Sequence, residues 1–503
     1  LRGVRMVGPN GIENIQHLPV VIIGAGFGGM ALAVKLQEAG IEDYHIFERA
    51  KEVGGTWRDN TYPGCACDVA SNLYSYSFAP NPSWAQTHGN QSEIFGYLKG
   101  VAKDFDLYPN IRFDHELIKA TWDKKAGQWL LATSQGKYTC SVLVTATGPF
   151  GEAVIPEFKG AESFKGSSFH SLHWDHDHDL KGKKVAIVGT GATAIQIVPE
   201  IQAEVEHLTV FQRTPSHVLP RVDVATSKIK RAAARHVPFF QRGIRAAWYA
   251  AYEGLVGLPQ FVDSRFLVPF EAAARYHLFK QVKDKDLREK LSPTYRFGCK
   301  RPVFSSKYFL SLQEENVDLV CSGIEEITET GIVDSKGVEH KIDTLIYATG
   351  FRSPHQISDK LFGKTGASLA EYFGSRPRAF MGTSIAGFPN LFMMMGPFSA
   401  AGNQSAVFML ETQAGYITNA VKTMREKGLK NVDVREDVLD AFTNEINDRS
   451  QKTSWVSGGC NSYFQNAEGG NAGLWPSWSF MHRWNSRKFD VNKYVVNSLE
   501  QVD

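Results

Sequence analysis

The sequence shows almost no excess of either charge: 55 Lys and Arg residues stand against 53 Asp and Glu, for a net charge of +2. Total charge therefore indicates neither a nucleic-acid partner nor an anionic membrane surface. The sequence also lacks any run near the roughly 18 apolar residues of a membrane span, and its N-terminus has no apolar signal core. We expect a cytoplasmic protein without a membrane span, and leave open whether residues 1–5 are a cloning remnant before Met6.

Cysteine is scarce as well, with six residues scattered over 503 positions. Only Cys65 and Cys67 lie close together, and their CxC spacing is neither a disulfide framework nor the CxxC of a dithiol redox pair. We therefore expect free thiols. The lack of a CxxC motif also argues against a pyridine-nucleotide disulfide reductase.

What the sequence does contain is two copies of one nucleotide-binding pattern. In the first, LPVVIIGAGFGGMALAVKLQEAG runs from an apolar strand into GxGxxG (Gly24, Gly26, Gly29) and an amphipathic helix, and the next strand ends in Glu48. Gly24 makes the turn, Gly26 lets the backbone approach a pyrophosphate, and Gly29 lets helix and strand pack closely. Glu48 is placed to accept hydrogen bonds from the ribose hydroxyls, so this unit predicts a dinucleotide site.

The second copy, KKVAIVGTGATAIQIVPEIQ, has Gly189, Gly191 and Ala194 in the glycine positions. Its next strand, HLTVFQRTP, ends in Arg213 and Thr214 instead of an acid. An arginine can bind a 2′-phosphate through two hydrogen bonds, whereas an acid would repel it. The second nucleotide is therefore expected to be NADPH, although an arginine at this position can also be an ordinary surface charge.

These two units predict an α/β protein with two Rossmann-like dinucleotide-binding domains, one for a bound redox cofactor and one for a diffusible reductant. Two segments, SVLVTATGPFG and DTLIYATGF, each end an apolar strand in Ala-Thr-Gly and are expected where the chain passes between domains. The expected limits are residues 1–150 and 346–503 for the two parts of the FAD domain, 151–183 for a linker, and 184–345 for the NADPH domain with a helical insertion at about 225–295.

A histidine-rich stretch, FKGSSFHSLHWDHDHDL at residues 164–180, raises the alternative of a metal site. Its histidines are His170, His173, His176 and His178. They have no accompanying HExxH motif and no distant cysteine pair, so metal binding is not the favoured interpretation.

The same stretch matches FxGxxxHxxxWD at Phe164, Gly166, His170, Trp174 and Asp175, and it lies between the two nucleotide motifs. It resembles the fingerprint of type I Baeyer-Villiger monooxygenases, which are class B flavoprotein monooxygenases. Sister enzymes that oxygenate nitrogen or sulfur usually carry Tyr or Phe at the position of Trp174. The resemblance makes His170 and Trp174 linker residues that couple nicotinamide binding to flavin state, and leaves His176 and His178 on a solvated loop.

The resemblance covers nearly the whole chain, through GGTWRDNTYPG, CDV, VFQRTP, CKRP, IYATGF, FPNLFMMMGP, SWVSGGCNSYF and GLWPSW. It departs from relatives of the ketone-oxygenating type at Tyr463 and Phe464, where they often carry Trp-Tyr. It implies an enzyme that uses FAD, NADPH and O2 to convert a small ketone to an ester or lactone through a C4a-peroxyflavin and a tetrahedral adduct. Sulfide oxidation is an expected side activity. The alternatives are an N- or S-oxygenating flavin monooxygenase and a noncatalytic nucleotide-binding module.

The resemblance also implies roles for individual residues. Arg301 in CKRP matches the catalytic arginine, a cation that cannot lose its proton and can hold a peroxide as an anion, and Asp68 matches the acid that orients it. The implied FAD contacts are Gly24, Gly26, Gly29, Glu48, Thr56, Trp57, Asp68 and Tyr74. The implied NADPH contacts are Gly189, Thr190, Gly191, Ala192, Thr193, Ala194, Arg213, Thr214, Lys300 and Trp455.

Overall fold

A computed structural model describes residues 15–237, 239–352 and 357–498. Its largest sheet has eight strands, ordered β17-β4-β5-β6-β1-β2-β3 with β18 also paired to β6. The strands are β1 (Gln16–Ile23), β2 (Tyr44–Phe47), β3 (Ile111–Arg112), β4 (Leu117–Asp123), β5 (Gln128–Thr133), β6 (Gly136–Thr145), β17 (Leu361–Phe362) and β18 (Leu391–Met393). The parallel strands β1, β2, β3, β6 and β18 form the nucleotide-binding half, and β4 and β5 extend it in antiparallel pairing.

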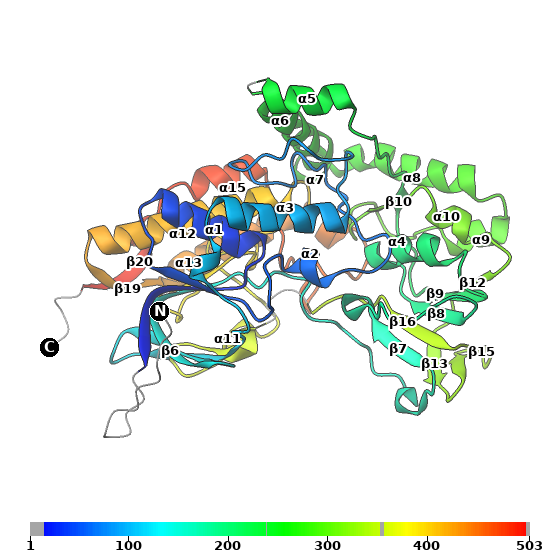
Figure 1. Cartoon of the computed structure of the whole chain (residues 1–503), viewed down its shortest axis with the longest axis horizontal. Coiled ribbons are helices and arrows are strands. Elements are labelled where there is room, and N and C mark those ends of the chain that lie inside the picture. The colour runs from blue at the N-terminus through cyan, green and yellow to red at the C-terminus, as the bar shows by residue number, and fades with distance from the viewer. Residues whose placement is uncertain (1–14, 238, 353–356, 499–503) are drawn as a thin grey trace.

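The second sheet has five parallel strands in the order β12-β9-β8-β16-β7. They are β7 (Ser167–His170), β8 (Lys184–Val188), β9 (His207–Phe211), β12 (Val317–Val320) and β16 (Thr344–Tyr347). Strand β7 comes from the range expected to be a linker. A three-stranded antiparallel sheet, β13 (Ile324–Ile327), β14 (Gly331–Asp334) and β15 (Glu339–Lys341), accompanies it. The two main sheets lie side by side in Figure 1, the second at the right.

Most of the helices lie above the two main sheets in Figure 1. The first sheet is accompanied by α1 (Phe27–Glu38), α3 (Gln91–Asp104), α11 (Leu369–Phe373), α12 (Ala406–Glu426) and α13 (Glu436–Ser450), and the second by α4 (Ala192–Ile201) and α10 (Tyr308–Ser311). Helix α12 packs against α1, and their apolar side chains form one core with β1 and β2. A second core joins α4 to the five-stranded sheet. Each nucleotide-binding helix is therefore held by a buried core of its own.

The predicted helical insertion is confirmed. Helices α5 (Lys228–His236), α6 (Phe240–Tyr252), α7 (Leu258–Phe261), α8 (Val268–Gln281) and α9 (Lys285–Lys290) lie between the paired short strands β10 (Val218–Leu219) and β11 (Val303–Phe304). Arg245 of α6 donates to the carbonyl oxygens of Asn72, Leu73 and Ser75, the last at 2.6 Å. The insertion therefore contacts the first domain on either side of Tyr74, one of the predicted FAD contacts.

The two Ala-Thr-Gly segments run side by side, as their position at domain crossings requires. Val154 N donates to the Gly350 carbonyl at 3.0 Å, and Arg352 N donates to the Glu152 carbonyl at 3.0 Å. The ring of Phe351 lies 5.2 Å from that of Phe150. The chain therefore crosses between the sheets twice at one place, as a short antiparallel pair.

The C-terminal part completes the first domain. It adds the antiparallel pair β19 (Leu429–Val434) and β20 (Tyr494–Ser498), and the short helices α14 (Ser454–Ser457) and α15 (Ser479–Asn485); α2 (Thr56–Asp59) belongs to the N-terminal part. Among the described helices, none is long and apolar enough to cross a membrane.

The expectation of free thiols is wrong for two of the six cysteines. Cys299 and Cys460 form a disulfide across 161 residues of sequence, while Cys65, Cys67, Cys140 and Cys321 are free. Sequence spacing gave no sign of this pair, because only packing of the late loop against the CKRP segment brings the two residues together.

Candidate active site

The first glycine loop has the shape of a phosphate cradle. Gly24 has a φ of +106°, and a Cβ on Gly29 would lie 2.0 Å from the Gly24 carbonyl oxygen, so neither position accepts a side chain. A Cβ on Gly26 would lie 3.7 Å from Gly55 Cα, an ordinary van der Waals contact, so the backbones of these two glycines pass close to each other. Helix α1 starts at Phe27 without a side-chain cap, so its first N–H groups are available to an anion.

Glu48 follows β2 and is buried beside this loop. Its carboxylate accepts hydrogen bonds from Ala25 N at 2.9 Å and Ala50 N at 3.0 Å. Arg58 forms an ion pair with it, with 2.9 Å between Nη1 and Oε1. The acid predicted to bind ribose is therefore held in a fixed position next to the glycine loop. Arg58, which our sequence interpretation did not single out, is part of the same arrangement.

Three predicted flavin contacts come together beyond the loop. Helix α2 begins at Thr56, and the next residue, Trp57, donates from Nε1 to the Tyr74 hydroxyl at 3.1 Å. Their rings meet edge to face at 5.7 Å, and Tyr74 also lies 5.2 Å from Phe27 at the start of α1. Burial raises the pKa of Tyr74, so it stays a neutral hydrogen-bonding group. This aromatic wall beside a phosphate cradle fits a large planar ring system such as that of FAD.

The second cradle repeats the first. Gly189 has a φ of +118°, and a Cβ there would lie 2.4 Å from the Ala348 carbonyl oxygen, while a Cβ on Gly191 would meet no atom within 4 Å. Helix α4 starts at Ala192, again without a side-chain cap. Thr190 donates from Oγ1 to the Thr214 carbonyl at 3.1 Å, which joins the loop to the segment that follows β9. Thr193 is half-buried and Ala194 is buried on the same helix.

Arg213 and Lys300 bring two positive charges to the edge of this second cradle. The pKa of Lys300 is lowered, first by burial and then by the nearby positive charge of Arg213. Within the described residues neither side chain is ion-paired with a carboxylate. Two neighbouring cations without an acid favour an anionic ligand, and the 2′-phosphate of NADPH is an anion of this kind.

Arg301 and Asp68 meet between the two domains. Nε of Arg301 donates to Oδ2 at 3.0 Å and Nη2 to Oδ1 at 2.8 Å, with 36% and 24% of the two side chains exposed. The Asp68 charge raises the pKa of Arg301 and outweighs burial. Burial acts to raise the pKa of Asp68, but the charge and hydrogen bonds of Arg301 lower it overall. Both groups are therefore charged, and the Nη1 group takes no part in the pair.

The surroundings of this pair include two tyrosines that our sequence interpretation did not assign to the site. Tyr252, at the end of α6, has a pKa raised to about 12, mainly by burial, and the charges of Asp68 and Arg301 both act on it. Tyr463, in the late loop, also lies near the pair. The late segment pointed to Tyr463 only through the family resemblance, and nothing in the local sequence indicated Tyr252.

Trp455 is buried in α14, and its ring lies 5.9 Å from that of Phe261. A Cβ on Gly402 would lie 2.6 Å from this ring, so the tryptophan packs directly on the backbone of the first domain. Trp455 is thus held by packing, in the same loop as Tyr463, and its contact with the coenzyme stays a prediction.

The fingerprint residues lie beside the domain crossing. Gly166 has no room for a side chain, since a Cβ would lie 2.4 Å from the Asp343 carbonyl oxygen and 2.5 Å from the Phe164 ring. His170 is buried with its ring 5.6 Å from Phe351, and burial lowers its pKa. Its position at the crossing is where a residue that couples the two domains would have to lie.

The rest of the fingerprint is more exposed. Trp174 is half-buried and contacts Phe169 edge to face at 5.3 Å, while Asp175 is exposed. His178 is not on a fully solvated loop as expected, because its Nε2 lies 2.8 Å from Thr344 Oγ1 on β16. His176 is exposed, with Nε2 2.7 Å from Thr61 Oγ1. No group of three His, Cys, Asp or Glu residues that could hold a metal ion occurs in the described part of the chain.

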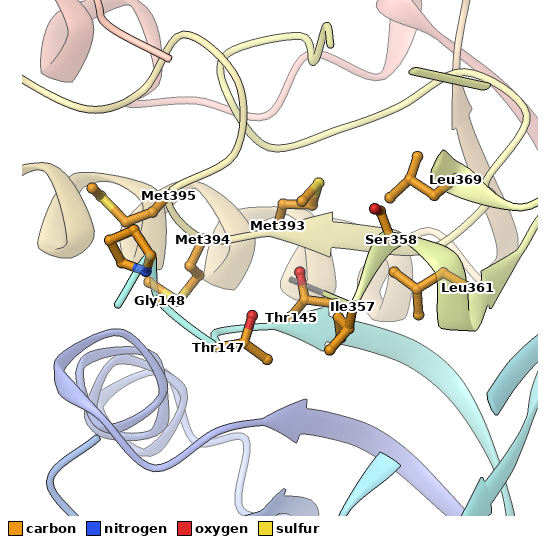
Figure 2. A pocket seen from close by; sticks show the side chains of 11 residues that line it. Thr145, Thr147, Gly148, Ile357, Ser358, Leu361, Leu369, Met393, Met394 and Met395 are labelled. Carbon is orange, nitrogen blue, oxygen red and sulfur yellow. The ribbon is translucent and has the colours of Figure 1, made fainter. Parts of the chain in front are cut away.

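A small pocket lies at the carboxyl end of β6 (Figure 2). Thr145, Thr147 and Gly148 line one side, and Met393 and Met394 on β18 and just beyond it line another. It contains none of the predicted site residues. The candidate active site is thus the region around Arg301, Asp68 and the two cradles.

Two dinucleotide cradles with a fixed cation between them define a flavoprotein oxidoreductase that takes its electrons from a nicotinamide coenzyme. Residues 21–228 match a family model described as pyridine nucleotide-disulphide oxidoreductase. A Baeyer-Villiger monooxygenase of Streptomyces coelicolor is 40% identical over 484 residues, covering 96% of this chain and 93% of the relative. The chain belongs to the Baeyer-Villiger monooxygenase family.

Solved structures agree with this assignment. An oxidised steroid monooxygenase bound to NADP superimposes with a TM-score of 0.84 at 28% identity, covering 96% of this chain and 99% of that one. OTEMO in complex with FAD and NADP superimposes with a TM-score of 0.86 at 25% identity, covering 95% and 99%. The predicted α/β fold, the cofactors FAD and NADPH, and the class of enzyme are confirmed: the chain is a FAD-containing, NADPH-dependent monooxygenase.

Proposed function

We propose that the protein uses NADPH and O2 to convert a small ketone to an ester or lactone by the C4a-peroxide route, with sulfide oxidation as a side activity. We place this reaction in the cytoplasm, where NADPH is supplied. We also propose that the domains have the limits expected from the sequence. The observation that carries it is the Arg301–Asp68 pair, a permanent cation held in place by two hydrogen bonds at the junction of the two domains.

The bound flavin, once reduced, supplies the activation of oxygen. The contribution that we assign to Arg301 is to stabilise negative charge on the reacting oxygen and, after attack, on the former carbonyl oxygen of the ketone. A guanidinium suits this role because it stays charged when half-buried, and its outward Nη1 group is not used by Asp68. Such preorganised charge typically contributes about 3–4 kcal/mol to a transition state.

The coenzyme is assigned to the second cradle. The first turn of α4 faces the diphosphate, while Arg213 and Lys300 bind the 2′-phosphate as a pair of cations with no competing acid in the described residues. Asp68 acts as a positioning residue, because it fixes the orientation of Arg301 through both oxygens. Trp174, with the fingerprint around it, favours ketone oxygenation over nitrogen or sulfur oxygenation as the main reaction.

Isotope labelling tests the proposal directly. Purified holoenzyme with NADPH and a panel of linear, cyclic and aryl ketones is incubated under ¹⁸O2, with thioanisole as the sulfide probe, and products are analysed by gas chromatography and mass spectrometry. We expect an ester or lactone carrying one ¹⁸O atom in the ring or ester oxygen. NADPH consumption with sulfoxide formation but no ester from any ketone would instead identify an S-oxygenating enzyme.

A further inference from the structure

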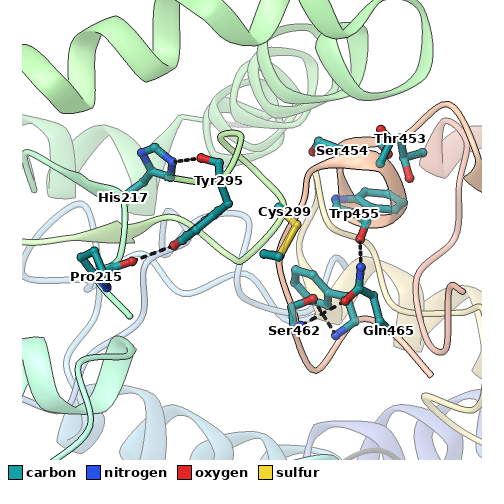
Figure 3. The surroundings of a disulfide bond; sticks show 12 residues. Pro215, His217, Tyr295, Cys299, Thr453, Ser454, Trp455, Ser462 and Gln465 are labelled. Carbon is teal, nitrogen blue, oxygen red and sulfur yellow. Dashed lines mark hydrogen bonds between the residues drawn. A yellow bond between two sulfur atoms is a disulfide. The ribbon is translucent and has the colours of Figure 1, made fainter. Parts of the chain in front are cut away.

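The disulfide lies next to the candidate catalytic residues. Cys299, which is fully buried, directly precedes Lys300 and Arg301. Cys460 follows Trp455 by five positions and precedes Tyr463 by three. The bond therefore joins the segment that carries both site cations to the late loop over residues 454–465 (Figure 3).

The two segments also touch at points other than the disulfide. A Cβ on Gly458 would lie 2.6 Å from Cys299 Cβ, and the Gly458 carbonyl accepts a hydrogen bond from Arg296 N at 3.0 Å. On the other side, Gln260 of the helical insertion accepts from Ser454 Oγ at 3.0 Å. The late loop thus lies between the insertion and the segment that leads into CKRP, and it is hydrogen-bonded to both.

The far end of the same loop reaches the cation. Burial raises the pKa of Tyr463, and the charge of Arg301 acts in the opposite direction, so the phenol lies within electrostatic reach of the cation. The residue as a whole is 52% exposed, and its ring packs against that of Phe464, with 4.4 Å between the centroids. Within the loop, Gln465 donates from Nε2 to the Trp455 carbonyl at 2.9 Å and so ties its two ends together (Figure 3).

We propose that the Cys299–Cys460 disulfide positions the late loop over Arg301 and the coenzyme site, with the two cysteines acting as positioning residues for NADPH binding and for coupling of NADPH oxidation to oxygen transfer. A covalent link removes conformations in which the loop moves away from the CKRP segment, and so lowers the entropic cost of closing over the coenzyme. This proposal rests on the proposed function only for the coupling; the coenzyme affinity and the loop position are independent of the ketone.

Thiol counting tests whether the bond is present. The purified protein, denatured without reductant, should show four titratable thiols, rising to six after reduction with dithiothreitol, which passes two electrons and two protons to the bond and becomes a cyclic disulfide. In the native protein only Cys321 is exposed, so one thiol should react quickly. Six thiols without reductant would overturn the proposal.

The functional test compares Cys299→Ser, Cys460→Ser and the double variant with Cys321→Ser as the matched control. Each bridge variant should raise KM for NADPH by about tenfold and double the fraction of NADPH that ends as hydrogen peroxide, with kcat for NADPH oxidation little changed. The double variant should be no worse than either single one. Cys321→Ser should resemble the parent. In both of these proteins, reduction should raise KM for NADPH and the peroxide fraction, and reoxidation should restore the original values.

Limited proteolysis gives a readout that needs no ketone. Reduction or either bridge substitution should speed cleavage within residues 456–470 at least fivefold, with FAD content unchanged, and saturating NADP should restore part of the protection. If the protein makes no ester but the bridge variants are cleaved faster and bind NADPH more weakly, the positioning role of the disulfide is supported. The same result would refute the proposed ketone oxygenation. If complete reduction changes neither KM for NADPH nor the rate of cleavage, the disulfide does not position the late loop.

Discussion

Arg301 and Asp68, 233 residues apart in sequence, are joined by two hydrogen bonds, from Nε to Oδ2 and from Nη2 to Oδ1. This side-on geometry holds the guanidinium plane in one orientation and directs its remaining Nη1 group away from the acid. One domain supplies the acid, and the segment that follows the helical insertion supplies the cation. The orientation of the cation therefore depends on how the domains meet.

Replacing Arg301 with alanine is expected to separate hydride transfer from oxygen transfer. FAD binding and flavin reduction by NADPH should persist, while ester formation should fall by about 10²–10³-fold, because one preorganised charge is lost. NADPH should then be oxidised with release of hydrogen peroxide. Stopped-flow absorbance at the flavin band, peroxide assay and product analysis measure the three steps.

Two further variants sharpen that experiment. Arg301→Lys keeps a charge but loses the two-point fork to Asp68, so ester formation should be reduced less than in the alanine variant. Arg296→Ala removes an exposed arginine five positions earlier in the same segment and should behave as the parent. Ester formation at near the parental rate in Arg301→Ala would assign the charge stabilisation to another group.

Gly29→Ala is expected to damage the FAD cradle. Its Cβ would lie 2.0 Å from the Gly24 carbonyl oxygen, so the glycine loop must move away from the helix start. We expect loss of most bound FAD, measured from the flavin-to-protein absorbance ratio after gel filtration. Gly96→Ala is the matched control, since that glycine lies within α3 with nothing within 4 Å of a new Cβ, and it should stabilise the protein by up to about 1 kcal/mol. Full FAD occupancy in Gly29→Ala would contradict the close packing assigned to this position.

The nucleotide-binding units were predictable because their information is local. Strand, turn and helix follow one another within about 30 residues, and Gly24 and Gly189 need positive φ values that favour glycine in any sequence context. The helical insertion could be predicted for the same reason, from a change of periodicity along one segment.

The site around Arg301 was predictable only through the family motifs, and its surroundings were not predictable at all. Tyr252 comes from a helix of the insertion, and the bridge partners Cys299 and Cys460 are 161 positions apart. No periodicity or spacing rule reports such contacts, because they join segments that lie far apart in the sequence. The same limit explains why His178 was expected to be solvated when it is hydrogen-bonded to β16.

His482 should make the protein sensitive to mild acid. It is fully buried, its ring lies 4.9 Å from that of Trp475, and burial lowers its pKa from 6.5 to about 4. The unfolded chain therefore binds a proton below pH 6.5 that the folded protein does not accept until about pH 4, so stability present above pH 6.5 is lost as pH falls through this range. The loss should reach about 3 kcal/mol.

His482→Gln keeps a donor for the Met381 carbonyl but cannot titrate. We expect its free energy of unfolding in urea to fall less than that of the parent between pH 7.5 and pH 4.5, by about 2–3 kcal/mol. Equal losses in both proteins would show that other groups govern acid sensitivity.

The choice of coenzyme should depend on Arg213 and Lys300. Arg213→Ala should raise KM for NADPH by the equivalent of about 2–3 kcal/mol and leave KM for NADH nearly unchanged, because only NADPH has a 2′-phosphate that the arginine can bind.

The lowered pKa of Lys300 adds a pH dependence. As pH rises, this lysine loses its proton earlier than an ordinary one, so KM for NADPH should rise in the alkaline range while KM for NADH stays level. In Lys300→Arg, whose guanidinium keeps its charge, that alkaline rise should disappear. Steady-state oxidation of both coenzymes from pH 7 to pH 10 gives all of these values, and equal losses for NADPH and NADH in Arg213→Ala would place the 2′-phosphate at other residues.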